Sequence, residues 1–454
     1  MTSRSREEVL SEALDAETLI EAETCQGSLQ SAGPLVRDSL SYLVSKVVPG
    51  FFGLVSVPVF VRLIGIEEYG RLSVILPVLL ALVGFGSGWL QQSILRFHPS
   101  SEDSSGPGSP FHRAVLLGTT YAVLVLALAL APILLAMRYR WSMWIIAEVY
   151  CFVQLVYLVC LTGLQARLQP RSVVMNEALR SAAGFLLPVC LVMVAGGRSF
   201  FLLLLGLALA YALPLAVGAG GLRSSLEITS AVAKPDQGES SRVLKELWRF
   251  GWAVGVWLML CQTLPIVGRS AIQRYGGYAQ AGVYASLYEL AVRSFSLFAA
   301  PVTQAAHPRI MRLWNLGDYA TARQTIGHAI RMQVLMFIPV EVVGILFASP
   351  LTRLALGADN RAPSSLLPLL MLGGFLWQIA LLVHKPLEIV QRTGTMLCGM
   401  VAVLLIECAG NYTLIPRFGM TAAVYVFLGG ALAYIAFVAF HSVLLRERLE
   451  RASV

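Results

Sequence analysis

The most regular feature of this chain is a series of long apolar runs separated by short polar segments. Twelve runs can be delimited, and each is long enough to cross about 30 Å of hydrocarbon as a helix. They are residues 39–64, 72–95, 114–137, 141–166, 173–195, 199–222, 249–268, 281–306, 329–349, 365–384, 393–412 and 419–445. Charged residues make up only 13% of the chain and hydrophobic residues 57%. The pattern predicts an all-α polytopic membrane protein with about twelve transmembrane helices.

The longest polar connector, at residues 223–248, divides these runs into two sets of six. We therefore expect two six-helix bundles, with a connector between them and a tail at each end of the chain. The N-terminal tail is acidic and is predicted to be mobile, as is the Ser-, Gly- and Pro-rich segment 96–113. The expected parts are the acidic tail 1–36, the first bundle 37–222, the connector 223–248, the second bundle 249–446 and the C-terminal tail 447–454.

The two sets of runs begin with a related turn. When the two halves of the chain are aligned, Arg62, Gly65 and Gly70 fall on Arg274, Gly277 and Gly282 with the same spacing. Both turns join the first and second runs of their set. Because an even number of spans separates the two copies, the repeat is predicted to be parallel, with a pseudo-two-fold axis along the membrane normal.

Basic residues are distributed unevenly between the two sides of the predicted helices. With the N-terminus inside, the inner segments carry about twice as many Lys and Arg residues as the outer loops. This bias predicts that both termini and the connector lie in the cytosol, with the helices in the cytoplasmic (inner) membrane. The net charge of +8 belongs to these loops and does not indicate nucleic-acid binding.

The first run carries residues that are unusual in a membrane helix. Lys46 lies about two turns inside it, beside Pro49 and Gly50, and Pro58 interrupts it again. A polar turn at 65–71 is predicted to follow. Unwound backbone at such interruptions often lines the site of a transporter. We therefore expect a hinge in this run and Lys46 in a central cavity, with snorkelling to the cytosolic headgroups as the alternative.

This opening resembles that of a known family. The segments are Ser45-Lys46-Val-Val-Pro-Gly-Phe-Phe, Val61-Arg62-Leu-Ile-Gly-Ile-Glu-Glu-Tyr-Gly70 and Ala281-Gly-Val-Tyr-Ala285. They are similar to polysaccharide flippases, the O-antigen and lipid-linked-oligosaccharide translocases of the MATE-like multidrug/oligosaccharidyl-lipid/polysaccharide exporter superfamily. The resemblance implies two six-helix bundles that face a central cavity and work by alternating access. The acidic N-terminal extension departs from the family pattern.

Charged residues inside the runs are informative, because each costs about 2.5–3.5 kcal/mol at mid-bilayer on insertion scales. Three pairs, two inside the runs and one directly after the tenth run, have the spacing that places partners on one helical face: Glu177 with Arg180, Glu289 with Arg293, and Lys385 with Glu388. We expect them to be structural ion pairs, or a polar lining of the cavity.

Other charged residues in the runs have no local partner, and among them Glu148, Glu341 and Glu407 are possible coupling carboxylates. The first and seventh runs contain no carboxylate. The first carries Lys46 instead, and Arg269 directly follows the seventh. Basic groups in a cavity of low dielectric suit an anion such as a lipid pyrophosphate.

We therefore expect Lys46 and Arg269 to hold the pyrophosphate, with Arg180 and Arg293 as further candidates. Outward snorkelling of Arg269 is the alternative. The sequence shows no HExxH motif, no Gly-rich phosphate loop and no CxxC motif. It therefore predicts no enzyme, no cofactor and no metal site.

The leading hypothesis is a flippase for a polyprenyl-pyrophosphate-linked oligosaccharide in cell-surface polysaccharide biosynthesis. Its partners would be this substrate, the membrane and other membrane proteins of polysaccharide assembly. Two alternatives stay open. One is a cation-coupled small-molecule exporter that uses Glu148, Glu341 or Glu407, and the other is a membrane scaffold that does not transport.

Overall fold

The computed structural model describes residues 48–98, 109–167, 169–218, 237–357, 363–390 and 392–452. Nearly all of these residues are helical, and none of them forms a strand. The tail 1–36, Lys46 and most of the segment 96–113 lie outside the described residues. The helices are Val48–Ile64, α2 (Ile66–Phe97), α4 (Pro110–Ala136), α5 (Trp141–Ala166), α6 (Pro170–Ala195), α7 (Phe200–Val217), α8 (Gln237–Asn315), α9 (Tyr319–Leu346), α10 (Ala348–Leu356), α11 (Leu366–Val383), α12 (Lys385–Ile389), α13 (Thr393–Phe418) and α14 (Met420–Ala452).

The helices confirm the predicted membrane architecture. Ten helices among the described residues are long and apolar enough to span a bilayer, and Val48–Ile64 is a shorter apolar helix. α8 contains two of the predicted spans, which meet at Gly277, where the backbone leaves the helical conformation. Counting α8 twice and adding Val48–Ile64 gives the expected twelve. Large apolar side chains such as Val194, Leu128 and Leu346 are exposed on the outer faces of these helices, as contact with lipid requires.

Two of the predicted polar segments are partly helical. The turn expected at 65–71 is reduced to Gly65, because α2 begins at Ile66 and Arg71 is already helical. Residues 237–248 of the predicted connector belong to α8. They are helical because Val243, Leu244 and Leu247 share one face, which packs against the core of the first bundle.

Local signals in the sequence account for several helix ends. Ser109 caps α4, where its side chain accepts a hydrogen bond from the backbone N–H of His112, and Pro110 occupies the first helical position. Asp318 caps α9 by accepting from the N–H of Thr321. α6 ends at Gly196 in the left-handed conformation, which glycine adopts without a steric cost.

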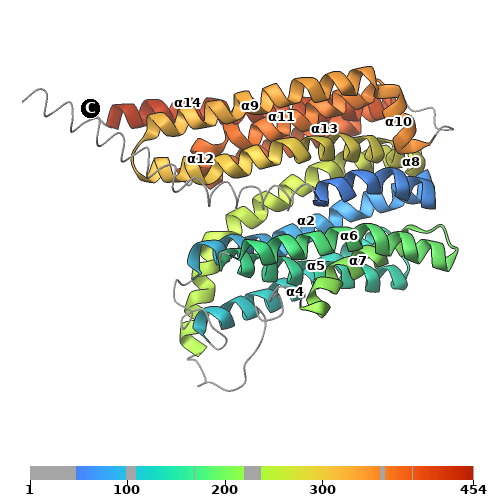
Figure 1. Ribbon diagram of the computed structural model, residues 1–454, viewed down its shortest axis with the longest axis horizontal. Helices are drawn as coiled ribbons and strands as arrows, with labels where there is room; N and C mark the ends of the chain where they lie inside the picture. Colours follow the sequence, from blue (N-terminus) through green and yellow to red (C-terminus); the bar gives the residue numbers. More distant parts are fainter. Residues whose placement is uncertain are drawn as a thin grey trace, which may run out of the picture.

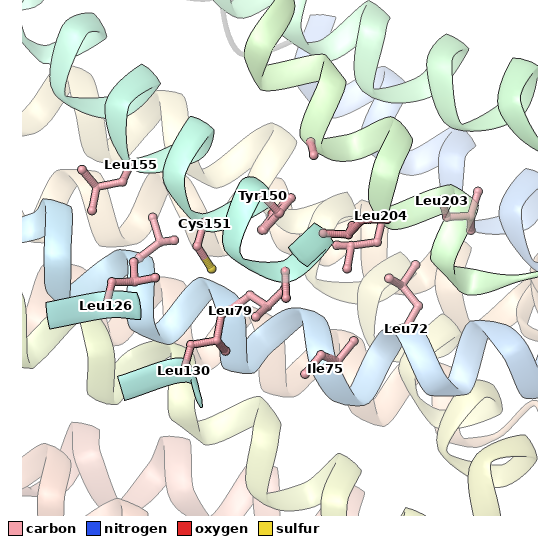
Figure 2. Packing of buried hydrophobic residues seen from close by; sticks show 14 of the residues in the cluster. Leu72, Ile75, Leu79, Leu126, Leu130, Tyr150, Cys151, Leu155, Leu203 and Leu204 are labelled. Atoms are coloured by element: carbon pink, nitrogen blue, oxygen red, sulfur yellow. The ribbon is translucent and has the colours of Figure 1, made fainter. Parts of the chain in front are cut away.

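The helices form two groups joined by α2 and α8 (Figure 1). α4 to α7 lie on one side and α9 to α14 on the other. Figure 2 shows the core of the first group, where leucines from α2, α4 and α7 meet Tyr150 and Cys151 of α5. The first half of α8 passes between the groups, because Leu247 lies in this core whereas Leu260 packs with α11, α13 and α14.

The two copies of the repeated turn meet across the molecule. Gly65 and Gly277 both have a positive φ, 87° and 79°, a region that disfavours residues with a Cβ. A Cβ on Gly70 would lie 1.9 Å from the carbonyl oxygen of Tyr278, and a Cβ on Gly282 would lie 2.2 Å from that of Ile66. The alignment of the two halves relates Ile66 to Tyr278 and Gly70 to Gly282. α2 and α8 therefore cross in a symmetric backbone contact, as a pseudo-two-fold axis requires.

Candidate functional site

Two arginines, the buried Arg269 and the half-buried Arg293, lie together with one glutamate in α8. Gly277 reverses the direction of this helix, so that Arg269 on its first half faces Glu289 on its second half. Nη2 of Arg269 lies 2.6 Å from Oε1 of Glu289, and Nε of Arg293 lies 2.9 Å from Oε2 of the same carboxylate. We call these three residues the Arg–Glu–Arg cluster. With both arginines and the glutamate charged, it carries one net positive charge.

Arg269 does not snorkel outward. Its side chain is only 3% exposed, and its guanidinium lies 5.1 Å from the ring centre of Tyr288. Its Nη1 donates to the backbone oxygen of Ser73 on α2, at 3.2 Å. Its Nε has no hydrogen-bond partner among the described residues. Sequence reasoning left Arg269 without a partner, because Glu289 is distant along the chain and only the reversal at Gly277 joins them.

Arg293 connects the cluster to the first helix. Its Nη1 donates to the backbone oxygen of Gly53 and to Oγ of Ser56, at 3.1 Å. A Cβ on Gly53 would lie 3.3 Å from this nitrogen, so glycine allows the close approach. The predicted pair of Glu289 and Arg293 therefore forms, and both arginines also bind the first bundle.

Arg180, the remaining described basic candidate, lies in another place. It is on α6, where Nη2 is 3.4 Å from Oε2 of Glu177, and its guanidinium lies 5.3 Å from the ring centre of Tyr211. The hydroxyl of Tyr157 donates to the same glutamate at 2.9 Å, and Nε2 of Gln154 donates to the Tyr211 hydroxyl at 3.2 Å. The predicted pair forms, within a polar group of α5, α6 and α7 that is separate from the Arg–Glu–Arg cluster.

The interruptions expected in the first helix do not break it within the described residues. The helix is continuous from Val48 to Ile64 and includes Gly50 and Pro58. Pro49 lies at the start of its described part. Gly50 faces Leu297 of α8, because a Cβ there would lie 2.5 Å from its Cδ1. Lys46 lies outside the described residues.

The three candidate coupling carboxylates show no ion pair among the described residues. Glu407 on α13 is buried, and its Oε1 has no hydrogen-bond partner within the part of the chain that the structure describes. It lies against Gly430 of α14. Oδ1 of Asn411, one turn along α13, is also without a partner. Glu341 has one buried oxygen in the same condition, and Glu148 is partly exposed on α5.

A further polar group lies where α11 meets α12. Nζ of Lys385 is 2.5 Å from Oε2 of Glu388, which confirms the predicted pair. His384 is buried beside them, with Nε2 at 3.5 Å from the same oxygen and Nδ1 at 3.4 Å from the Tyr434 hydroxyl. His384 was not singled out from the sequence, although its position directly before Lys385 was a usable signal. The described residues contain no group of side chains that could hold a metal ion.

Comparison with known proteins gives a family and a fold. A family model described as "Polysaccharide biosynthesis protein" matches residues 35–314. The structure entitled "Lipid II flippase MurJ, inward closed conformation" is similar at a TM-score of 0.66 and 13% identity, over 89% of this chain and 87% of that chain. A structure of an "Inward-facing conformation of a multidrug resistance MATE family transporter of the MOP superfamily" gives a TM-score of 0.64 and 14% identity, over 92% and 96% of the two chains. No curated protein sequence matches.

The other similar structures include one of the "MATE multidrug transporter DinF-BH in complex with R6G", with a TM-score of 0.60 and 17% identity, over 91% of this chain and 95% of that chain. At these identities the similarity shows the fold alone, which is a two-lobed polytopic membrane fold. The similarity covers nearly the whole chain, so both halves share this architecture. The family match covers the first bundle and all of α8 except its final residue, including the Arg–Glu–Arg cluster.

Proposed function

Because this chain belongs to the polysaccharide biosynthesis protein family, we propose that it translocates a polyprenyl-pyrophosphate-linked oligosaccharide across the cytoplasmic membrane by alternating access. The sugar–pyrophosphate head passes between the two bundles, while the lipid tail stays in the bilayer. Two solved structures of similar fold are those of a lipid II flippase and of a MATE family transporter, which favours translocation over catalysis. Membrane proteins of polysaccharide assembly are the expected partners.

The observation that carries this proposal is the Arg–Glu–Arg cluster between the bundles. Arg269 and Arg293 approach one carboxylate from two sides, at 2.6 and 2.9 Å, so their guanidinium groups converge on one anion. Guanidinium groups bind phosphate oxygens as they bind carboxylate oxygens, and they can do so through two N–H groups at once. If a diphosphate takes the place of the carboxylate, each arginine can bind one of its two phosphoryl groups. Lys46 and Arg180 are assigned as secondary contacts of the same substrate.

The distribution of Lys and Arg supports an orientation with both chain termini in the cytosol. In that orientation the end of the molecule that carries the C-terminus in Figure 1 faces the cytosol, and the end that carries α10 faces outward. Glu407 is the favoured coupling carboxylate, because a buried carboxylate without a donor needs a proton or a cation. The same feature favours the second candidate function, a cation-coupled small-molecule exporter.

A reconstituted flipping assay tests the proposal. Purified protein in liposomes is given a fluorescent polyprenyl-pyrophosphate oligosaccharide, and its movement between leaflets is measured. Arg269→Gln and Arg293→Gln are expected to lower the rate by about tenfold or more, because charge-assisted hydrogen bonds contribute about 1.5–3 kcal/mol each. Arg331→Gln is the matched control, because this arginine is exposed on α9.

Two results would count against the proposal. If both variants insert normally and translocate at the wild-type rate, the assignment of charge is wrong. If the wild-type protein instead exchanges a cationic dye for Na⁺ or H⁺, and Glu407→Gln abolishes that exchange, the exporter is the better description.

A further inference from the structure

The arginines of the Arg–Glu–Arg cluster also hold the two bundles together. Nη1 of Arg269 donates to the backbone oxygen of Ser73 on α2. Nη1 of Arg293 donates to the backbone oxygen of Gly53 and to Oγ of Ser56 on the first helix. Three hydrogen bonds between the bundles therefore depend on the two side chains that would bind a diphosphate.

The acceptors of these three bonds are neutral. Two are backbone carbonyl oxygens and the third is a hydroxyl, and the hydroxyl of Ser56 itself donates to the Gly53 oxygen at 2.7 Å. A guanidinium bonds a phosphate oxygen more strongly than a neutral oxygen, because both partners are then charged. An arriving diphosphate therefore competes well for the same N–H groups.

Glu289 is the negatively charged acceptor already in place. One of its oxygens accepts a hydrogen bond from Arg269 and the other accepts one from Arg293. Glu289 therefore compensates the positive charge of the two arginines when no substrate is present. A diphosphate must displace this carboxylate, at least in part, before it can bind both arginines. Glu289 therefore sets the affinity of the site for the anion.

We propose that Arg269 and Arg293 form a latch between the two bundles that a diphosphate group opens, and that Glu289 is the internal anion the diphosphate replaces. The proposal rests on the proposed function and adds a mechanism to it. Binding of the headgroup withdraws the arginines from Gly53, Ser56 and Ser73, which removes three of the bonds that hold the first helix and α2 to α8. Substrate binding and bundle movement are coupled because they use the same N–H groups.

Coupling of this kind is reciprocal. If the diphosphate binds better to the released state, a variant that weakens the latch must bind the diphosphate more tightly. Ser56→Ala is the most suitable variant, because it removes one acceptor of Arg293 and leaves every charge in place. Ser294→Ala is its matched control, since the Ser294 hydroxyl donates only to Leu290 of its own helix.

The experiment combines binding with a distance measurement on the full-length protein. Spin labels at Phe51 of the first helix and Leu335 of α9, both exposed, report the separation of the bundles by double electron–electron resonance. Inorganic pyrophosphate is the probe and inorganic phosphate the comparison, with affinities from isothermal titration calorimetry. Pyrophosphate is expected to shift the wild-type distance distribution toward longer distances, and phosphate to shift it less.

Ser56→Ala is expected to show part of this shift without ligand and to bind pyrophosphate at least about fivefold more tightly, the lower end of usual coupling factors. Ser294→Ala should match the wild type. Glu289→Gln is expected to bind pyrophosphate more tightly still, because it removes the competing charge.

If pyrophosphate binds the wild type and neither the ligand nor Ser56→Ala changes the distances, the latch is refuted while the proposed function stands. If the wild type does not bind pyrophosphate at all, the proposed function fails and the latch proposal fails with it.

Discussion

Replacing Gly70 or Gly282 by alanine tests how the two bundles are held where α2 crosses α8. At Gly70 the new Cβ would lie 1.9 Å from the Tyr278 oxygen, and at Gly282 the distance to the Ile66 oxygen would be 2.2 Å. Ordinary contact begins at 3.4 Å, so in either variant the helices must separate by more than an ångström, and by more at Gly70 than at Gly282. Both obstacles are backbone atoms, which have no rotamer to change.

Forced overpacking of this kind costs about 1–3 kcal/mol. The penalty applies only while the helices are in contact, so each substitution should shift the equilibrium between the contacting and separated arrangements by about 5- to 150-fold. Gly429→Ala is the matched control, because it lies in α14 and its Cβ would meet nothing within 4 Å.

Spin labels at Arg198 and Arg417, one on each bundle, measure the effect in a background without native cysteines. Both residues are exposed, near the ends of α6 and α13. Gly70→Ala and Gly282→Ala should lengthen the distance between the labels, and transport should fall as the contacting arrangement is lost. The reasoning is refuted if both variants give the distances and the transport rate of Gly429→Ala.

Three smaller predictions follow from other contacts. Arg62→Gln should lengthen the same label distance slightly, because Nη2 of Arg62 donates to the Leu354 oxygen of α10 at 2.9 Å; an unchanged distribution would show that this bond does not hold the bundles. Leu79→Ala, at a fully buried position, should cost about 2–5 kcal/mol of stability in detergent, whereas a similar loss in the exposed control Leu128→Ala would contradict the packing argument. Asp318→Ala should lower the melting temperature more at pH 7 than at pH 3. The N–H and hydroxyl of Thr321 lower the pKa of Asp318, so its contribution is present above its unfolded pKa and is lost as the pH falls through the folded value; an equal effect at both pH values would rule this out.

The membrane spans could be predicted from the sequence because apolar length is a direct physical requirement for crossing hydrocarbon. The run 141–166 coincides with α5, and 173–195 differs from α6 only at its start. The repeat was also recoverable, since Gly65 and Gly277 occupy equivalent backbone conformations. The start of α8 was not recovered, because residues 237–248 are polar enough to resemble a loop. Their apolar residues pack against α2 and α4, which the sequence does not show.

The part of the candidate site that rests on local spacing could be predicted from the sequence. Glu177 and Arg180 are neighbours on one helical turn, and spacing alone predicts their contact. Arg269 and Glu289 are far apart in the sequence, and they meet only because α8 reverses at Gly277. No periodicity in the sequence reports that geometry. The backbone acceptors at Gly53 and Ser73 are still less visible, because any residue type supplies a carbonyl oxygen.

The repeat makes the backbone of the two halves similar, but the chemistry of the site is not repeated. The alignment that relates Gly282 to Gly70 also relates Arg269, Glu289 and Arg293 to Val57, Pro77 and Ala81. The charged groups of the cluster thus all lie on the second copy, and the first copy supplies neutral acceptors to them. Because the crossing of α2 and α8 is symmetric, the two bundles can rotate about one axis in equivalent ways. Because the Arg–Glu–Arg cluster is asymmetric, a single anion can change the contacts that join the two bundles. Introducing the charged residues into the first copy would give each bundle its own anion site, and the competition on which the proposed coupling depends would be lost.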